Sequence, residues 1–580
     1  MRTQMSHRRR VRPGDGEWPS EADWADLERQ LGGRLIRLES PLAACRTTPD
    51  GPACVAALER LDDPYYLGDQ PALTQASGYL DAWQSAPSAY AVAAETTEDV
   101  VAAVDFARAH DLRLVVKGGG HSYQGTSNSA DSLLIWTRAM NGIDLHSTFV
   151  PDGCDGRLAP QPAVTVGPGA IWMSVYNAVT TRAGRYVQGG GCLTVGVAGL
   201  IQSGGFGSFS KAYGLAAAGL LEAEVVTADG SVRIANAGSE PDLFWALRGG
   251  GGGGFGIVTR LTLRTRDLPE RFGEASGRIK AHSDVAFRSL IGRVVGFYRE
   301  RLFNPHWGEQ IRLAPDNTVR IGMVFQGLSR QQAEDAWQPL VDWVASASED
   351  VAWEAPLSIV DLPARQFWDA EALGRLAPQR IVVDARPDAR PGEFFWAGNR
   401  NEAGQFFHAY RSAWLPVSLL EEDRQMALVD ALFVGSRHWG IALHVNKALG
   451  GAPEADRAAA RDTAMNPAVL DAFALVVVAA EGPPAYADMP GRDPDLTAAR
   501  RDAAAVGQAF AEVVKLVPAY GSYVSESDFF ERDWQRAFWG SNYERLAAVK
   551  RRYDPGGLFF AHHGVGSEEW SDDGYAGSEG

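Results

Sequence analysis

Three glycine-rich tracts decide the fold of this chain: VVKGGGHSYQG at 115–125, GGGCLTVGVAGLIQSGGFGSFSKAYGL at 189–215 and LFWALRGGGGGGFGIVTRL at 243–261. The first tract follows a predicted strand, and glycines at such a position let backbone N–H groups approach a pyrophosphate closely. A packed helix would not tolerate so many glycines, because each costs about 1 kcal/mol relative to alanine. The tracts therefore predict a backbone that lies against a flat ligand. Taken alone, the first is also typical of a tight turn with a surface histidine, and Cys192 of an inert buried thiol.

Length and charge restrict the class of protein. A chain of 580 residues is expected to form two or three packed units. The formal net charge of −17 argues against a nucleic-acid partner, which needs a basic surface. No apolar run reaches the roughly 20 residues of a membrane-spanning helix. We therefore expect a soluble protein with no nucleic-acid and no membrane partner.

The four cysteines exclude a disulfide scaffold in a chain of this size, and no metal-ligand spacing occurs, so we expect no metal. Cys45 and Cys54 are close enough in sequence to form a disulfide in an oxidising compartment, and two free thiols are an equal alternative. The Arg8–Arg10 triplet lacks the apolar region of an export signal. The compartment, cytoplasmic or exported, stays open.

The periodicity of apolar residues predicts the order of helices and strands. A βαβ unit is expected from Tyr90, with a helix over 98–110 capped by Thr97 and a strand that ends at Lys117. Further strands are expected at 132–136, 163–167 and 223–230, and helices at 22–31, with Ser20 as its cap, and at 172–182. After residue 268 the glycine tracts stop, and longer amphipathic helices alternate with strands. These helices are predicted at 281–302, 330–346, 452–463 and 494–515, with a last one at 541–552.

The three tracts, in this order and spacing, resemble the FAD-linked oxidases of the berberine bridge enzyme-like group, within the vanillyl-alcohol oxidase superfamily. The closing run NYERLAAVKRRYDPGGLFF at 542–560 is similar to the C-terminal segment of that family. The resemblance implies an α+β fold. It consists of a two-lobed PCMH-type FAD-binding domain and an α/β substrate domain whose antiparallel sheet is covered by helices.

On this basis the chain is expected to divide into five parts. The FAD-binding domain is predicted at 81–268, the substrate domain at 269–515 and the C-terminal segment, which returns to the FAD-binding domain, at 516–566. The first 80 residues are expected to form a partly disordered N-terminal extension, with a disordered arm over 1–20. A disordered tail is expected at 567–580.

The resemblance also gives roles to single residues. The family's histidine, here His121, carries the bond to the flavin 8α-methyl group, and its cysteine, here Cys192, carries the bond to flavin C6. A neutral imidazole and a thiolate are side chains able to add to an electrophilic ring. The remaining residues expected to hold FAD are Lys117, Gly118, Gly119, Gly120, Ser122, Gly125, Val195, Gly196, Gly199, Gly204, Gly205, Gly256, Val258, Asn542 and Tyr543.

Two positions depart from the family's pattern. Phe206 stands where many relatives have a tyrosine, and Tyr523-Val524-Ser525 replaces their YxN sequence. Tyr523 and Glu526 are the first candidates for the catalytic base, and His444 is a third, with a structural role as its alternative. A group of aromatic residues fits either a ring-bearing substrate or core packing: Phe394, Phe395, Trp396, Phe406 and Phe407.

The expected activity is that of a FAD-dependent oxidase with covalently held FAD. An alcohol or amine substrate would give a hydride to flavin N5, and O2 would reoxidise the flavin to give H2O2. Val195 favours O2 as acceptor, because the resemblance implies that valine at this position admits oxygen. The alternatives are a dehydrogenase with another acceptor and a flavin-holding binding protein with little turnover. The expected partners are a small-molecule substrate and O2.

Overall fold

A computed structural model describes residues 8–387 and 389–577 of the chain. In it, the strand before the first glycine tract lies at the edge of a four-stranded sheet of order β1-β4-β6-β5. The pairs β4/β6 and β5/β6 are parallel, as the βαβ pattern predicts, whereas β1 is antiparallel to β4. The elements of this unit are β1 (Leu35–Arg37), β4 (Tyr90–Ala93), α5 (Thr97–Ala109), β5 (Leu114–Lys117) and β6 (Leu133–Trp136).

The predicted cap of α5 is wrong by one residue. Thr96 is the N-cap, because its side chain accepts a hydrogen bond from the backbone N–H of Asp99, and Thr97 is the first residue of the helix. By contrast, Ser20 caps α1 (Glu21–Gln30) as predicted, and Trp24 of this helix stacks on Tyr90 with 4.0 Å between ring centroids. The first helix therefore packs against the parallel sheet.

A second, antiparallel sheet carries the other two glycine tracts at its margins. Its strands have the order β11-β10-β12-β8-β7, and β9 pairs with the end of β12. They are β7 (Ile143–Phe149), β8 (Gln161–Val166), β9 (Arg185–Val187), β10 (Leu220–Val226), β11 (Val232–Asn236) and β12 (Ile257–Asp267). The helices around it are α6 (Trp172–Tyr176), which continues as a π-helix to Arg182, α7 (Val197–Gln202), α8 (Ser210–Tyr213) and α9 (Pro241–Ala246), joined by the C-terminal α16 (Trp534–Trp539) and α17 (Tyr543–Tyr553).

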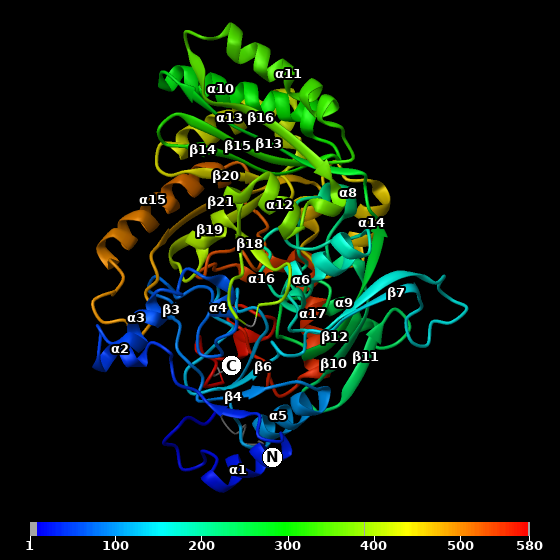
Figure 1. Ribbon diagram of the computed structural model, residues 1–580, viewed down its shortest axis with the longest axis vertical. Helices are drawn as coiled ribbons and strands as arrows, with labels where there is room; N and C mark the ends of the chain where they lie inside the picture. The colour runs from blue at the N-terminus through cyan, green and yellow to red at the C-terminus, as the bar shows by residue number, and fades with distance from the viewer. Residues whose placement is uncertain (1–7, 388, 578–580) are drawn as a thin grey trace, which may run out of the picture.

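A nine-stranded sheet forms the upper part of the molecule in Figure 1, and helices cover one of its faces. Its order is β16-β13-β15-β14-β20-β21-β19-β2-β3, and every pair is antiparallel except β2/β19. The strands are β13 (Arg271–Ala281), β14 (Trp307–Ala314), β15 (Thr318–Gln326), β16 (Val351–Pro363), β19 (Phe406–Pro416), β20 (Ile441–His444), β21 (Ala472–Gly482), β2 (Gly78–Tyr79) and β3 (Trp83–Gln84). The covering helices are α10 (Asp284–Phe297), α11 (Arg330–Ser346), α13 (Glu422–Ser436) and α15 (Leu496–Val514), and shorter elements nearby are α12 (Ala370–Leu376), α14 (Glu454–Arg461), β17 (Ile381–Val383) and β18 (Phe394–Trp396). The expected α+β fold with a helix-covered sheet is confirmed.

The N-terminal region contributes strands to the four-stranded sheet and to the nine-stranded sheet, so it is not a separate extension. β1 joins the parallel sheet, and β2 and β3 extend the nine-stranded sheet. Between these strands lie α2 (Ala43–Thr47), α3 (Pro52–Leu58) and α4 (Pro64–Gly68). Cys45 and Cys54 form a disulfide, which decides the alternative that the sequence left open.

The expectation of disorder at both ends is wrong for the described residues 8–20 and 567–577. Arg9 and Ala576 form an antiparallel bridge, and the buried guanidinium of Arg10 donates to Gly574 O at 2.5 Å and to Gly557 O. The same guanidinium lies 4.0 Å from the ring centroid of Trp570. The two ends are therefore ordered by each other. Residues 1–7 and 578–580, for which disorder was also expected, lie outside the described residues.

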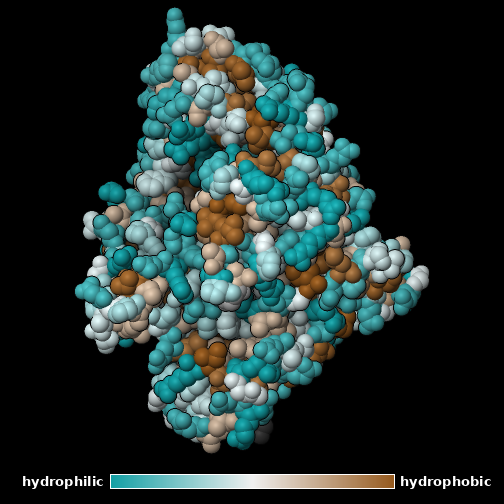
Figure 2. Space-filling model, viewed as in Figure 1, coloured by the Kyte–Doolittle hydropathy of each residue, from teal (hydrophilic) through white to brown (hydrophobic). Residues whose placement is uncertain are grey.

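Among the described residues, no helix has the length and apolar character needed to cross a membrane. The face of the molecule in Figure 2 is mostly hydrophilic, with apolar side chains in separate patches.

We expect Arg10→Ala to destabilise the protein by about 2–3 kcal/mol, because hydrogen bonds from a charged donor contribute about 1.5–3 kcal/mol. Arg9→Ala is the matched control. Its side chain is 67% exposed and pairs with Asp15 at the surface, so its effect should stay below about 1 kcal/mol. Thermal unfolding and protease sensitivity of the termini measure both. Equal effects of the two substitutions would contradict the ordering role of Arg10.

Candidate functional site

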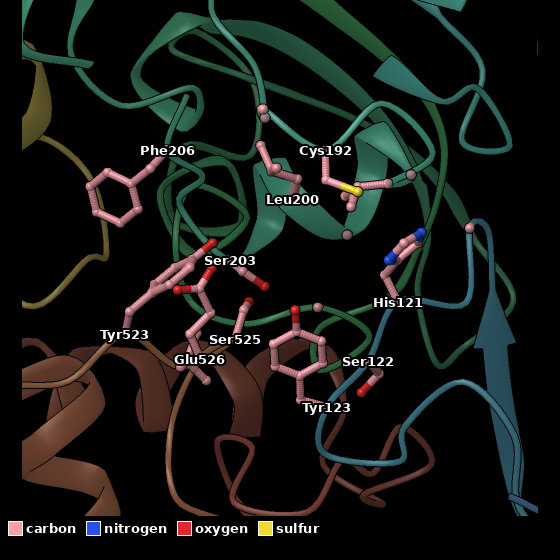
Figure 3. Close-up of a pocket in the computed structure, with 18 of the residues that line it drawn as sticks. His121, Ser122, Tyr123, Cys192, Leu200, Ser203, Phe206, Tyr523, Ser525 and Glu526 are labelled. Carbon is pink, nitrogen blue, oxygen red and sulfur yellow. The ribbon is translucent and has the colours of Figure 1, made fainter. Parts of the chain in front are cut away.

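A cavity of about 1110 Å³ lies where the three sheets meet. All three glycine tracts line it, together with the uncovered face of the nine-stranded sheet and the C-terminal segment 559–565. Figure 3 shows one part of this cavity, with His121 and Cys192 on one side and Tyr523 and Glu526 on the other. Residues that are more than 400 positions apart in the sequence therefore line a single site.

The first two glycine tracts are in backbone contact with each other. A Cβ atom at Gly119 would lie 2.7 Å from the backbone nitrogen of Gly196. Real Cβ atoms do not approach a backbone nitrogen so closely, so only glycine fits at position 119. This contact brings the loop after β5 against the loop before α7, and His121 and Cys192 lie on these two loops.

One hydroxyl group joins the two residues expected to bind the flavin. Thr194 Oγ1 lies 3.0 Å from His121 Nε2 and 3.8 Å from Cys192 Sγ. Both side chains line the cavity, so the imidazole and the thiol occupy the same part of its wall. Thr194 Oγ1 therefore holds the imidazole at Nε2, and the histidine tautomer decides which of the two groups donates.

Burial sets the protonation of this pair. Desolvation lowers the pKa of His121 to about 3, so its imidazole is neutral at physiological pH and keeps a free lone pair. Desolvation also raises the pKa of Cys192 to about 12, and the nearby Glu402 raises it further. The two side chains therefore differ in protonation: the imidazole of His121 is neutral, whereas Cys192 keeps its thiol proton.

Most of the other residues predicted to hold FAD line the cavity. They are Gly118, Gly119, Gly120, Ser122, Val195, Gly196, Gly199, Gly256 and Val258. Residues 250–254 of the third tract line it as well.

Six predicted FAD-binding residues do not line the cavity. Lys117 points away from it, and its ammonium donates to Gln70 O at 2.6 Å and to Leu73 O. Its buried side chain therefore fastens the N-terminal region under the first glycine tract. Asn542 donates to Met465 O at 2.7 Å, and Tyr543 donates to Glu568 at 2.5 Å.

The other three are glycines with positive φ that pack against side chains: Gly125 against Trp83, Gly204 against Met465 and Gly205 against Leu200. They have a structural role in their loops. The lining of the cavity gives no support to the prediction that these three, Lys117, Asn542 and Tyr543 hold FAD, and it stays a prediction.

The three candidate bases all line the cavity. Glu526 is bound to Lys447, whose Nζ lies 2.7 and 2.5 Å from its carboxylate oxygens. Burial raises the pKa of Tyr523, so its hydroxyl stays protonated at neutral pH. Burial lowers the pKa of His444 well below its ordinary value, and within the described chain its Nδ1 has no hydrogen-bond partner. Of the three, Glu526 is the group that forms an ion pair.

Sequence reasoning missed four other carboxyl groups among the described residues of the cavity wall: Glu274, Glu309, Glu402 and Glu481. Glu309 lies on β14, accepts a hydrogen bond from Ser208 Oγ at 2.5 Å and has a positive φ of 69°. A Cβ atom at Gly191 would lie 3.5 Å from Glu309 Oε1, so this carboxyl faces the loop that carries Cys192. Nothing in the strand sequence WGEQIRLA distinguishes Glu309 from a surface glutamate, and a positive φ at a non-glycine residue cannot be read from sequence.

The expected aromatic wall is only partly present. Trp396 and Phe407 line the cavity, and Trp396 Nε1 donates to Gly191 O at 3.1 Å. Phe394, Phe395 and Phe406 are buried in the core. Further aromatic residues outside the predicted group also line it, among them Tyr123, Tyr410 and Trp439.

Comparisons with known proteins agree with this architecture. A family model described as "FAD binding domain" matches residues 87–236, and one described as "Berberine and berberine like" matches residues 522–566. The FAD-linked oxidoreductase malF of Malbranchea aurantiaca is 30% identical over 97% of this chain and 93% of its own length. The VAO-type flavoprotein oxidase VAO615 of Thermothelomyces thermophilus is 28% identical over 97% of this chain and 94% of its own length.

Solved structures have the same fold. The VAO-type flavoprotein MtVAO615 from Myceliophthora thermophila C1 has a TM-score of 0.78 and 25% identity, covering 98% of this chain and 99% of that one. A xylooligosaccharide oxidase from the same organism, solved with xylobiose, has a TM-score of 0.64 and 20% identity, covering 93% and 98%.

The matching family models and relatives identify the chain as a FAD-linked oxidoreductase, and the glycine-lined cavity between the sheets fits that class. The chain belongs to the berberine bridge enzyme-like FAD-linked oxidoreductases of the vanillyl-alcohol oxidase superfamily. It is an enzyme of that family, as the resemblance implied.

The cavity residues fit FAD. Glycines of all three tracts form part of its wall, so that backbone N–H groups can approach a ligand closely. A dinucleotide offers polar groups along its whole length, and the glycine tracts leave its phosphates room against the backbone.

We expect Glu309→Gln to stabilise the protein at pH 8 but not at pH 4. Burial raises the pKa of Glu309 above its ordinary 4.5. The folded state then holds the proton more tightly than the unfolded state, so stability falls as the pH rises from the unfolded value through the folded one. Glutamine does not ionise, so the variant does not lose this stability as the pH rises. Melting temperatures across pH 4–8 measure the difference, with Glu334→Gln on the surface of α11 as control. A gap independent of pH would contradict the assignment.

Proposed function

We propose that this protein is an oxidase that holds FAD by two covalent bonds, to His121 and Cys192, and oxidises an alcohol or amine with O2 as the electron acceptor. The observation that carries the proposal is the convergence of the His121 imidazole and the Cys192 thiol on Thr194 Oγ1, in the wall of a glycine-lined cavity. A histidine and a cysteine that only filled the core would have no reason to face one cavity together.

Bound FAD supplies a two-electron acceptor for hydride from the substrate carbon. The chain's own residues would bind the substrate and move its proton. Glu526, which Lys447 holds by an ion pair, is proposed to accept the hydroxyl or amine proton. Tyr523 would act as a hydrogen-bond donor, and His444 as a neutral partner that orients the substrate.

Two carboxyl groups would then have different tasks. Glu526 is paired with an ammonium group, whereas burial raises the pKa of Glu309 so that it keeps its proton to higher pH. Two carboxyl groups that lie in different environments of one cavity are typical of acid–base sites. Glu309 would donate a hydrogen bond while Glu526 accepts the proton.

Val195 supports O2 as the acceptor. It lies in the cavity wall, three residues after Cys192, at the position where the family's valine admits oxygen. The alternatives are a dehydrogenase with another acceptor and a flavin-holding protein with little turnover. Peroxide yield separates the three.

Acid-denatured wild type should retain the mass of FAD, with flavin on the peptides of both His121 and Cys192. Each single variant, His121→Ala and Cys192→Ala, should keep flavin on the other residue only, and the double variant should release it. Mass spectrometry with peptide mapping measures this, and Cys154→Ala, a buried thiol away from the cavity, is the control. Free release of FAD from the wild type would overturn the covalent proposal.

A panel of aromatic alcohols, amines and oligosaccharides should contain substrates that release H2O2 in proportion to product. With such a substrate, Glu526→Gln should slow anaerobic flavin reduction by roughly 10²–10⁴-fold, the usual contribution of a general base. Flavin content should be unchanged. Asp533→Asn, at the surface in an ion pair with Arg536, is the control. Reduction at the wild-type rate in Glu526→Gln would exclude it as the base.

A further inference from the structure

A second, small pocket of about 20 Å³ lies beside the two attachment residues. His121, Cys192 and Thr194 line it together with Glu402, Tyr123 and Asn399. Glu526, Tyr523, His444 and Lys447, the groups proposed to act on the substrate, do not line this pocket. Glu402 lines both the small pocket and the large cavity, and it is the carboxyl group that shares the small pocket with Cys192.

The Cys192 thiol needs a proton acceptor before its sulfur can form a bond. Burial raises its pKa to about 12, so almost no thiolate exists at neutral pH. His121 is a poor acceptor, because burial lowers its pKa to about 3. The Tyr123 phenol stays protonated, since burial raises its pKa well above the ordinary value.

Glu402 is the remaining acid–base group in the wall of the small pocket. The other lining residues are amides, a proline, an alanine and the hydroxyl of Thr194. Asn399 Nδ2 donates to Glu402 Oε2 at 2.8 Å, which fixes one carboxylate oxygen and leaves the other free. The Glu402 residue as a whole is exposed, but its carboxyl group reaches the pocket wall, where desolvation raises its pKa and the Asn399 hydrogen bond opposes the shift.

We propose that Glu402 accepts the thiol proton of Cys192 when the sulfur–flavin bond forms, and therefore serves assembly of the holoenzyme and not substrate turnover. This inference rests on the proposed attachment at Cys192. The sulfur forms a bond to a ring carbon, and the C–H bond at that carbon breaks and releases its proton to solvent. The two electrons left on the ring pass to O2, which takes up two protons and becomes H2O2.

Removing the charge of Glu402 has opposite effects in the two possible roles. As a mere neighbouring charge, Glu402 raises the pKa of Cys192, so Glu402→Gln would favour the thiolate and speed attachment. As the proton acceptor, its loss would slow attachment by at least about tenfold. The sign of the change therefore distinguishes the two roles.

The experiment starts from purified wild type, Glu402→Gln and Glu481→Gln, each isolated with its flavin. Samples incubated in air at pH 7 and pH 9.5 are acid-quenched, and peptide mapping with thiol alkylation gives the fraction of Cys192 that is bonded. Glu402→Gln should carry flavin on His121, keep an alkylatable Cys192 at pH 7 and gain the second bond at pH 9.5, as thiolate forms without help. Glu481→Gln removes a charge from the same large cavity but outside the small pocket, and should match the wild type.

Wild type without covalent flavin would refute the proposed function itself. Wild type with both bonds, and Glu402→Gln that forms the sulfur bond at pH 7 as fast or faster, would overturn this inference alone. Loss of flavin from both residues in Glu402→Gln would also overturn it, because Glu402 would then be needed for binding. Glu402→Asp, which keeps a carboxyl group on a shorter side chain, should form the bond at an intermediate rate.

Discussion

The close approach of Gly119 to Gly196 is the contact on which the site depends. It joins the loop after β5, in the parallel sheet, to the loop before α7, at the margin of the antiparallel sheet. Any side chain at position 119 would separate the loops, and with them His121 and Cys192. The nine-stranded sheet then closes the cavity above both, and β2 and β3 link it to the N-terminal region.

Desolvation is the main cause of the pKa shifts of the ionisable groups around this contact. It keeps the imidazole of His121 neutral, holds Cys192 as a thiol and raises the pKa of Glu309 and Glu402. Glu526, in contrast, has Lys447 as a partner inside the same cavity. Carboxyl groups of one chemical type can therefore serve separate steps, because their neighbours and not their identity set their protonation.

The sequence was informative where structure is local. Apolar periodicity predicted the βαβ unit, the helices on the nine-stranded sheet and the Ser20 cap, since each depends on neighbours within a few residues. It failed where partners are distant. Lys117 precedes the three glycines of the first tract and was expected to hold FAD, but its acceptors at Gln70 and Leu73 lie in another part of the chain. The expectation of disordered termini failed for the same reason, because Arg10 donates to Gly574 O, more than 500 residues away in the sequence.

Phe206 shows how the site can keep polar chemistry after the loss of a hydroxyl. Its ring meets the Tyr523 ring edge to face, with 5.0 Å between centroids, so the position where relatives have a tyrosine is apolar here. Tyr523 is confined by this contact and by burial, and the charged pair of Glu526 and Lys447 lies in the same cavity wall. A paired carboxylate needs no deprotonation to accept a proton, whereas a buried phenol does. Under the proposed function, the ion pair of Glu526 and Lys447 would therefore take the polar role that the resemblance gives to a tyrosine at position 206.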